Sequence, residues 1–266
     1  MMLFTPLRPD PTALLPRANP AAKLGAALLL MLALFFSADG VTAAVVLAGL
    51  AVATALSGLS LRVLLRRTWP LLIAALSVSV LNTFLAGEQH GDPIGVGPLT
   101  IGSDTLLTGI GLGLRLLGIA YSGVLAMVTT DPTDLADSLV QQLRLSPRFA
   151  VGALAAARLL PIMADEWQIL TLARRARGVD ARRSPIAAVR LFFGQLLALL
   201  VAAVRRGTRL ATAMEARGFG ALPCRSVARR QTVAPRDLVL LGSAAALGAA
   251  AVVISVAAGT WRFLLG

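Results

Sequence analysis

The chain has one cysteine, Cys224, and one histidine, His90, among its 266 residues. A single thiol forms no internal disulfide, and so few cysteines and histidines provide no cluster of the kind that holds zinc. The lone histidine also removes the usual serine–histidine and cysteine–histidine pairs unless that one residue serves. No GxxxxGK[ST] segment is present, so the chain does not supply the common ATP-binding loop itself. The sequence therefore predicts no catalytic residues, no metal site and no cofactor, and it argues against an enzyme.

Charge is also scarce, because only 14% of the residues are charged whereas soluble domains carry about 25%. In contrast, 57% of the residues are hydrophobic and the mean hydropathy is +0.79. A chain of this composition belongs in a lipid bilayer. We predict an all-α, multi-pass integral membrane protein with about five to six transmembrane helices and additional long cytoplasmic or interfacial helices.

The positive charge is concentrated in one segment. Residues 144–236 contain 17 of the 25 lysines and arginines and four acidic residues. A basic block inside an apolar protein is typical of the cytoplasmic face, where it meets anionic lipids or an acidic partner. No fold or aromatic platform for nucleic acid accompanies the charge, so the sequence predicts no nucleic-acid binding.

Apolar runs and loop charges divide the chain into four parts. Arg62, Arg66 and Arg67 are expected to form a short basic loop inside the cell, and the acidic loop 87–104 is expected outside, with a small hairpin. The runs of roughly spanning length are at about 21–38, 41–61, 69–86, 105–129 and 238–258. The expected organisation is a cytoplasmic N-terminal arm (1–20), N-terminal transmembrane helices (21–130), a cytoplasmic helical region (131–235) and a C-terminal transmembrane helix (236–266).

Three helices are expected in the cytoplasmic region. Asp131 and Pro132 suit the start of the first. The second is expected from Pro147 to Arg177, with a kink at Pro161, and the third from Ser184-Pro185 to Arg217. The apolar stretch of the third helix is short and interrupted, so we expect this helix in the membrane interface or packed inside the protein.

The last two helices end on the same three residues. Segment 170–181, "LTLARRARGVDA", matches 210–221, "LATAMEARGFGA", at six of twelve positions. A simpler interpretation is routine helix termination, because glycine is a common C-cap and arginine suits the last turn. Two such ends nevertheless indicate two similar binding sockets, which a dimeric partner would provide. The arginine of each end offers a guanidinium that can bind carboxylates or carbonyls of the partner. The candidate contact residues are Ala176, Arg177, Gly178, Ala216, Arg217 and Gly218.

The sequence resembles the transmembrane T component (EcfT/CbiQ-like family) of energy-coupling factor (ECF) ABC transporters. The resemblance rests on "NPAAKL", "TTDPTDLADSL", "ARLLP" and both Ala-Arg-Gly segments. It implies that residues 131–235 contain coupling helices whose ends dock in two ATP-binding-cassette ATPase subunits. It further implies that ATP binding moves the docked ends and tilts a separate membrane substrate-binding S component for vitamin or metal-ion uptake. The implied location is the cytoplasmic membrane of a bacterium or archaeon.

Two alternatives remain. Asp131, Asp134 and Asp137 have a spacing similar to that of intramembrane prenyltransferases, which bind diphosphate through magnesium, although no second aspartate cluster is present. A self-contained carrier is the other alternative. Apart from Arg115, however, no span shows the charged or broken-helix pattern that is expected of a substrate path. Arg115 fits a structural or a functional role equally well. Met214-Glu215 replace Arg174-Arg175 before the second motif, which hints at two non-identical ATPases.

Overall fold

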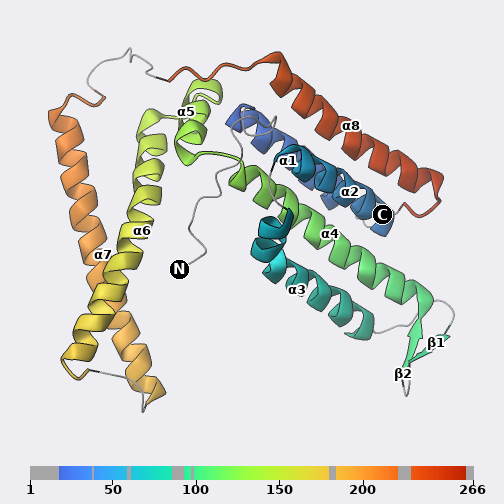
Figure 1. Cartoon of the computed structure of the whole chain (residues 1–266), viewed down its shortest axis with the longest axis horizontal. Coiled ribbons are helices and arrows are strands. Elements are labelled where there is room, and N and C mark those ends of the chain that lie inside the picture. Colours follow the sequence, from blue (N-terminus) through green and yellow to red (C-terminus); the bar gives the residue numbers. More distant parts are fainter. Residues whose placement is uncertain are drawn as a thin grey trace. The chain divides into compact units, whose positions relative to one another are not determined.

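The computed structural model describes residues 18–37, 39–58, 61–85, 93–96, 99–179, 184–220 and 229–261. The described residues form eight α-helices and one short antiparallel strand pair (Figure 1). The chain divides into two compact units. One, here called the bundle unit, comprises Met1–Ser138 and Gln231–Gly266, and the other, the hairpin unit, comprises Leu139–Arg230. The predicted all-α membrane architecture is confirmed.

The bundle unit contains five long helices around a core of small and aliphatic side chains. Its most buried side chains include Leu34, Val46, Leu50 and Ala251. The helices are α1 (Pro20–Phe36), α2 (Gly40–Leu56), α3 (Leu61–Leu85), α4 (Ser103–Val128) and α8 (Pro235–Ala257). In Figure 1, α4 lies between α3 and the α1–α2 pair, and it packs on all three. Helix α8 packs on α1 and α2.

Glycines bring α4 close to its neighbours. A Cβ atom at Gly113 would lie 2.8 Å from the Ala75 carbonyl oxygen of α3. A Cβ atom at Gly111 would lie 3.2 Å from the Cα atom of Gly40, where α2 begins. Small residues of this kind let membrane helices approach until their backbones touch.

The hairpin unit consists mainly of two long antiparallel helices, α6 (Pro147–Ala176) and α7 (Pro185–Ala216). Helix α5 (Pro132–Gln142) begins in the bundle unit and ends in the hairpin unit. An ion pair between Arg206 and Glu166 joins α7 to α6. Most residues of α6 and α7 are exposed, so this pair of helices has little core of its own.

Short polar side chains begin several helices, as the sequence suggests. The Asn19 side chain accepts from the Ala21 N–H at 2.9 Å at the start of α1. Asp131 accepts from the Thr133 N–H at 2.7 Å and so begins α5 as predicted. Side-chain oxygens at such positions satisfy N–H groups that the first turn of a helix leaves without partners.

Two boundaries differ from the sequence prediction. The basic loop expected at residues 62–67 is helical, because α3 begins at Leu61. Arginine and leucine favour helix, so the helix continues beyond its apolar stretch. Helix α2 ends at Leu56, five residues before the expected end of the apolar run at 61. The expected hairpin is confirmed as β1 (Pro93–Val96) paired with β2 (Leu99–Gly102), with Ile94 opposite Ile101.

Five described helices are long and apolar enough to cross a membrane: α3, α4, α6, α7 and α8. Helices α1 and α2 are apolar but shorter, with 17 residues each, or about 26 Å at 1.5 Å per residue. The sequence predicts α7 in the membrane interface or packed inside the protein, because its apolar stretch is short and interrupted. Over its whole length, however, α7 is long and apolar enough to span. Length and composition thus agree with a multi-pass membrane protein.

Candidate functional site at two helix ends

Helix α6 ends in a hydrogen-bonded cap at the first Ala-Arg-Gly segment. The Gly178 N–H donates to the Arg175 carbonyl at 2.9 Å, and the Val179 N–H donates to the Arg174 carbonyl at 3.0 Å. Gly178 has φ +75°, which glycine adopts without steric cost. These are the bonds of a Schellman motif, which satisfies the last carbonyls of a helix and turns the chain away.

Helix α7 ends in the same cap at the second segment. The Gly218 N–H donates to the Glu215 carbonyl at 2.9 Å, and the Phe219 N–H donates to the Met214 carbonyl at 3.0 Å. Gly218 also has φ +75°. The apolar residue after the glycine is typical of this motif, and Phe219 takes the place that valine has in the first cap. The sequence repeat is therefore a repeat of backbone structure.

All six candidate contact residues are exposed. They are Ala176, Arg177, Gly178, Ala216, Arg217 and Gly218. No interaction within the part of the chain that the structure describes engages the guanidinium of Arg177 or Arg217. Each cap thus presents a planar cation with five donors to solvent or to a partner.

The two caps lie at opposite ends of the helical hairpin. The Arg174 guanidinium, one turn before the first cap, donates to the Leu191 carbonyl of α7 at 2.9 Å. The second cap is reached only at Arg217, where α7 ends. At 1.5 Å per residue, the helix between Leu191 and Arg217 is about 40 Å long. The sequence predicts both motifs on the cytoplasmic side of the membrane. The antiparallel pairing of α6 and α7 separates the two caps along the hairpin.

Side-chain contacts join the helices near the first cap. The Gln195 amide donates to the Thr171 hydroxyl at 3.1 Å. The Trp167 and Phe192 rings meet edge to face, with centroids 5.3 Å apart. Together with the Arg174 bond, these contacts make the first end of the hairpin tightly linked.

The second end carries an open groove of about 500 Å³ between the start of α6 and the end of α7. We call it the small-residue groove, because Gly152, Ala155, Ala156, Gly207 and Ala211 line much of it. Arg148, Glu215 and Phe219 line it beside the second cap. The two ends of the hairpin therefore share a cap but differ in their surroundings.

Helix α7 also carries an exposed apolar stripe. Its members recur every three or four residues and so lie on one helix face. They are Ile186, Val189, Phe193, Leu197, Leu200 and Val204, each more than half exposed. A continuous apolar surface of this length indicates contact with lipid or with another apolar helix.

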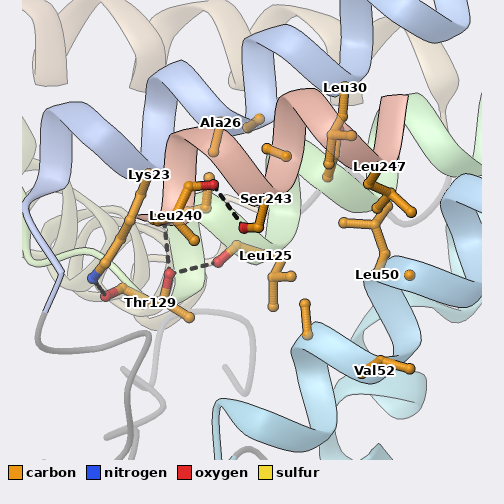
Figure 2. A pocket seen from close by; sticks show the side chains of 16 residues that line it. Lys23, Ala26, Leu30, Leu50, Val52, Leu125, Thr129, Leu240, Ser243 and Leu247 are labelled. Carbon is orange, nitrogen blue, oxygen red and sulfur yellow. Dashed lines mark hydrogen bonds between the residues drawn. The ribbon is translucent and has the colours of Figure 1, made fainter. Parts of the chain in front are cut away.

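A buried polar cluster joins four helices of the bundle unit. Figure 2 shows Lys23 of α1 with its ammonium on the Thr129 carbonyl at the end of α4, at 2.7 Å. Asp134 of α5 and Asp237 of α8 are close enough to interact with this cation. Asp237 is fully buried and also accepts from the Asn19 N–H at 2.7 Å. The cluster holds the start of α5 against the bundle.

Beside this cluster, the bundle unit contains an apolar pocket of about 240 Å³ (Figure 2). It lies between α1, α2, α4 and α8, and Lys23, Leu30, Leu50, Leu125 and Leu247 are among its lining residues.

Arg115 of α4 has a structural role in the bundle unit. Its guanidinium donates to the Phe35 carbonyl near the end of α1, and it lies 5.7 Å from the centroid of the Phe35 ring. A cation that meets the last carbonyls of a helix is favourable. This contact explains how the span tolerates a charged side chain.

Two of the three aspartates of the prenyltransferase alternative are used by the fold. Asp131 caps α5, and Asp134 interacts with Lys23 and accepts from the Gln231 amide at 3.5 Å. Within the described residues, no group of three histidines, cysteines or acids is placed to hold a metal ion. Nothing in this arrangement supports a diphosphate site.

Sequence reasoning missed Lys23 and Asp237 as a buried cluster. The sequence did contain a signal. Lys23 lies early in one apolar run and Asp237 lies directly before another, and such charges are costly in a membrane unless they are paired. The pairing itself needs the fold, since the two residues are far apart in the sequence.

Comparison with known proteins matches residues 12–226 to the family described as cobalt transport protein, CbiQ. The energy-coupling factor transporter transmembrane protein EcfT of Heliobacterium modesticaldum (strain ATCC 51547 / Ice1) is 32% identical over 218 residues, covering 76% of this chain and 79% of its own. The protein of the same name from Staphylococcus aureus (strain 04-02981) is 27% identical over 237 residues, covering 84% and 86%. That from Exiguobacterium sibiricum (strain DSM 17290 / CCUG 55495 / CIP 109462 / JCM 13490 / 255-15) is 28% identical over 247 residues, covering 89% and 93%.

Proposed function

Because the chain belongs to the CbiQ family of cobalt transport proteins, we propose that it couples two ATPase subunits to a substrate-binding membrane subunit. It is a multi-pass membrane protein of the cell membrane and a transmembrane component of an energy-coupling factor transporter. The chain itself transmits movement, and the partner ATPases hydrolyse ATP. The substrate, a vitamin or a metal ion, is selected by the separate membrane subunit.

The observation that supports this proposal is the repeated cap. A dimer of related ATPase subunits presents two similar surfaces, so a single chain that binds both needs a similar element twice. Helices α6 and α7 provide it as two exposed Ala-Arg-Gly ends with equal hydrogen-bond geometry. Arg177 and Arg217 are the proposed anchors, because a guanidinium binds carboxylates and carbonyls through several donors.

The hairpin suits the transmission of movement. A helix is stiff along its axis, so a displacement of one docked end reaches the other end of the hairpin about 40 Å away. The exposed stripe of α7 offers an apolar surface to the substrate-binding subunit or to lipid. We propose that residues 131–235 form the cytoplasmic coupling region. Closure of the ATPase dimer then moves the two caps relative to each other, and the stripe passes this motion to the neighbouring subunit.

The test is detergent co-purification of the full chain with its ATPase subunits. Arg177→Glu and Arg217→Glu are each expected to lower the captured ATPase by about tenfold, and the double variant is expected to abolish capture. Arg205→Glu is the matched control, since Arg205 is also exposed on α7 and lies about 18 Å from Arg217 along the helix. Equal capture by all variants would show that the caps only terminate helices.

A further inference from the structure

We propose that the two helix ends select two different ATPase subunits through the charge at one equivalent position. Arg175 directs the first cap to a socket with acidic side chains, and Glu215 directs the second cap to a socket with basic side chains. This inference rests on the proposed function, because it specifies the partners of the same two caps.

Arg175 and Glu215 occupy the same place in two caps of equal geometry. Each precedes the Ala-Arg-Gly segment directly, and the carbonyl of each accepts from the cap glycine N–H at 2.9 Å. Both residues are exposed, and no interaction in the described ranges engages either charged group. Because side-chain direction on a helix follows backbone position, both side chains project toward the same part of their sockets.

The position before Arg175 and Glu215 also differs between the two segments, with Arg174 in one and Met214 in the other, but these two side chains face the hairpin itself. Arg174 is directed at α7, where its guanidinium donates to the Leu191 carbonyl at 2.9 Å. Its counterpart Met214 lines the small-residue groove. Both residues are thus used within the hairpin, and the charge difference offered to a partner is the one between Arg175 and Glu215.

The charges around each cap reinforce the difference. Near the first cap, Arg190 is exposed on α7, and the described residues 167–179 and 184–195 contain no acidic residue, whereas Asp180 lies outside the described residues. Near the second cap, Arg148 and Glu215 both line the small-residue groove. A Cβ atom at Gly220 would lie 3.4 Å from the Arg148 guanidinium, so this cation sits against the chain just after the second cap. The first end is basic, and the second has both signs.

Identical sockets would not suit both ends. A socket that attracts Arg175 repels Glu215, whereas the shared arginine of each cap binds either socket. Specificity is a difference between affinities, and like charges placed against each other are an effective way to create it. An exposed ion pair changes the affinity of a complex by up to about fivefold. A cap that is attracted by one socket and repelled by the other should therefore prefer the first by about tenfold.

Site-specific photo-crosslinking in membranes tests the assignment. A photoreactive residue replaces Val179 in one variant and Phe219 in another, and the full chain is co-expressed with its ATPase subunits under separate tags. We expect one ATPase subunit to predominate at position 179 and a different one at position 219. The double exchange Arg175→Glu with Glu215→Arg is expected to shift both ratios by about tenfold toward the opposite subunit, and less at high salt.

Arg205→Glu serves as the control and is expected to leave both ratios within about twofold. One kind of ATPase subunit at both positions, or ratios that the double exchange does not shift, would overturn the inference and leave the proposed function standing. Failure to capture any ATPase at either position would overturn both.

Discussion

Single polar residues have different roles in the two units. In the bundle unit, Lys23, Asp39 and Asp237 are buried, and each bonds to a helix other than its own. In the hairpin unit, Arg177 and Arg217 are exposed at helix ends. Buried charge in a membrane protein is costly unless it is paired, whereas exposed charge remains available to a partner.

Replacement of Lys23 tests the buried cluster. Lys23→Met removes the donor to the Thr129 carbonyl and the cation near Asp134 and Asp237. Loss of one member of a buried charged group costs about 3 kcal/mol, so thermal unfolding in detergent should begin at clearly lower temperature. Leu28→Met, at an exposed position of the same helix, is the control. Equal unfolding temperatures would mean that the cluster does not stabilise the bundle.

Asp39, at the turn between α1 and α2, should make stability depend on pH. Burial raises the pKa of its carboxyl, but hydrogen bonds from Ser255, Ser37 and Thr42 outweigh it and leave the pKa below the usual value. Because the pKa of this carboxyl is lower in the folded than in the unfolded state, its ionisation stabilises the folded protein at pH values above the unfolded-state pKa, near 3.9. This stabilisation is lost as the pH falls through the folded-state pKa.

The variant Asp39→Asn removes this titration. Its unfolding free energy should be lower than that of the parent by about 1–3 kcal/mol at pH 7, because a hydrogen-bonded carboxylate is lost. The difference between the two proteins should shrink as pH falls from about 5 toward 3. A constant difference over this range, measured by denaturant unfolding in detergent, would contradict the assignment.

At the scale of elements, close contact between helices depends on positions without a side chain. Gly113 of α4 faces the α3 backbone, and a Cβ atom there would lie 2.8 Å from the Ala75 carbonyl oxygen. Backbone atoms do not move aside as a flexible side chain does, so the α3–α4 pair is sensitive to this position. By contrast, a Cβ atom at Gly123 of the same helix would be 4.0 Å from the nearest atom, the Met31 methyl carbon.

This contrast gives a matched pair of variants. Gly113→Ala should separate α3 from α4 and lower stability by about 1–3 kcal/mol, since overpacking forces the backbone to shift. Gly123→Ala should be neutral or slightly stabilising, because alanine favours helix over glycine. Thermal unfolding of both variants in the same detergent is the measurement. If both variants lost a similar amount of stability, the effect would come from the loss of a glycine and not from the close contact between α3 and α4.

At the scale of the whole molecule, the proposed coupling requires the hairpin to stay stiff between its two caps. The contacts near the first cap, such as Trp167 against Phe192, join α6 to α7. A hairpin with weakened contacts still presents Arg177 and Arg217, and so should still bind the ATPases. It should nevertheless transmit less of their movement.

Trp167→Ala tests this separation of binding from transmission. The variant loses an edge-to-face pair worth about 1 kcal/mol beyond its buried area. We expect ATPase co-purification within about twofold of the parent, whereas substrate uptake in cells falls several-fold. Phe149→Ala, an exposed position on the same helix, is the control. Parallel loss of binding and uptake would show that Trp167 supports the cap itself.

The sequence alone determined the elements and the candidate residues. Composition predicted the membrane location, and caps and apolar runs predicted the helices that became α6 and α7 within one residue. The repeated tripeptide located both caps, because a Schellman motif depends on a few neighbouring residues and on glycine at one of them. Local interactions of this kind are encoded within a short stretch of chain. Even here, the start of α3 was missed, since arginines suit both a basic loop and a helix.

Only the tertiary structure decided which distant residues meet. Lys23, Asp134 and Asp237 come from three separate segments, and the role of Arg115 at Phe35 depends on how α4 packs on α1. The antiparallel pairing of α6 and α7 placed the two caps at opposite ends, and the bond from Arg174 to Leu191 left Arg175 as the exposed charge. These contacts depend on helix packing, which brings together residues that no local sequence pattern links.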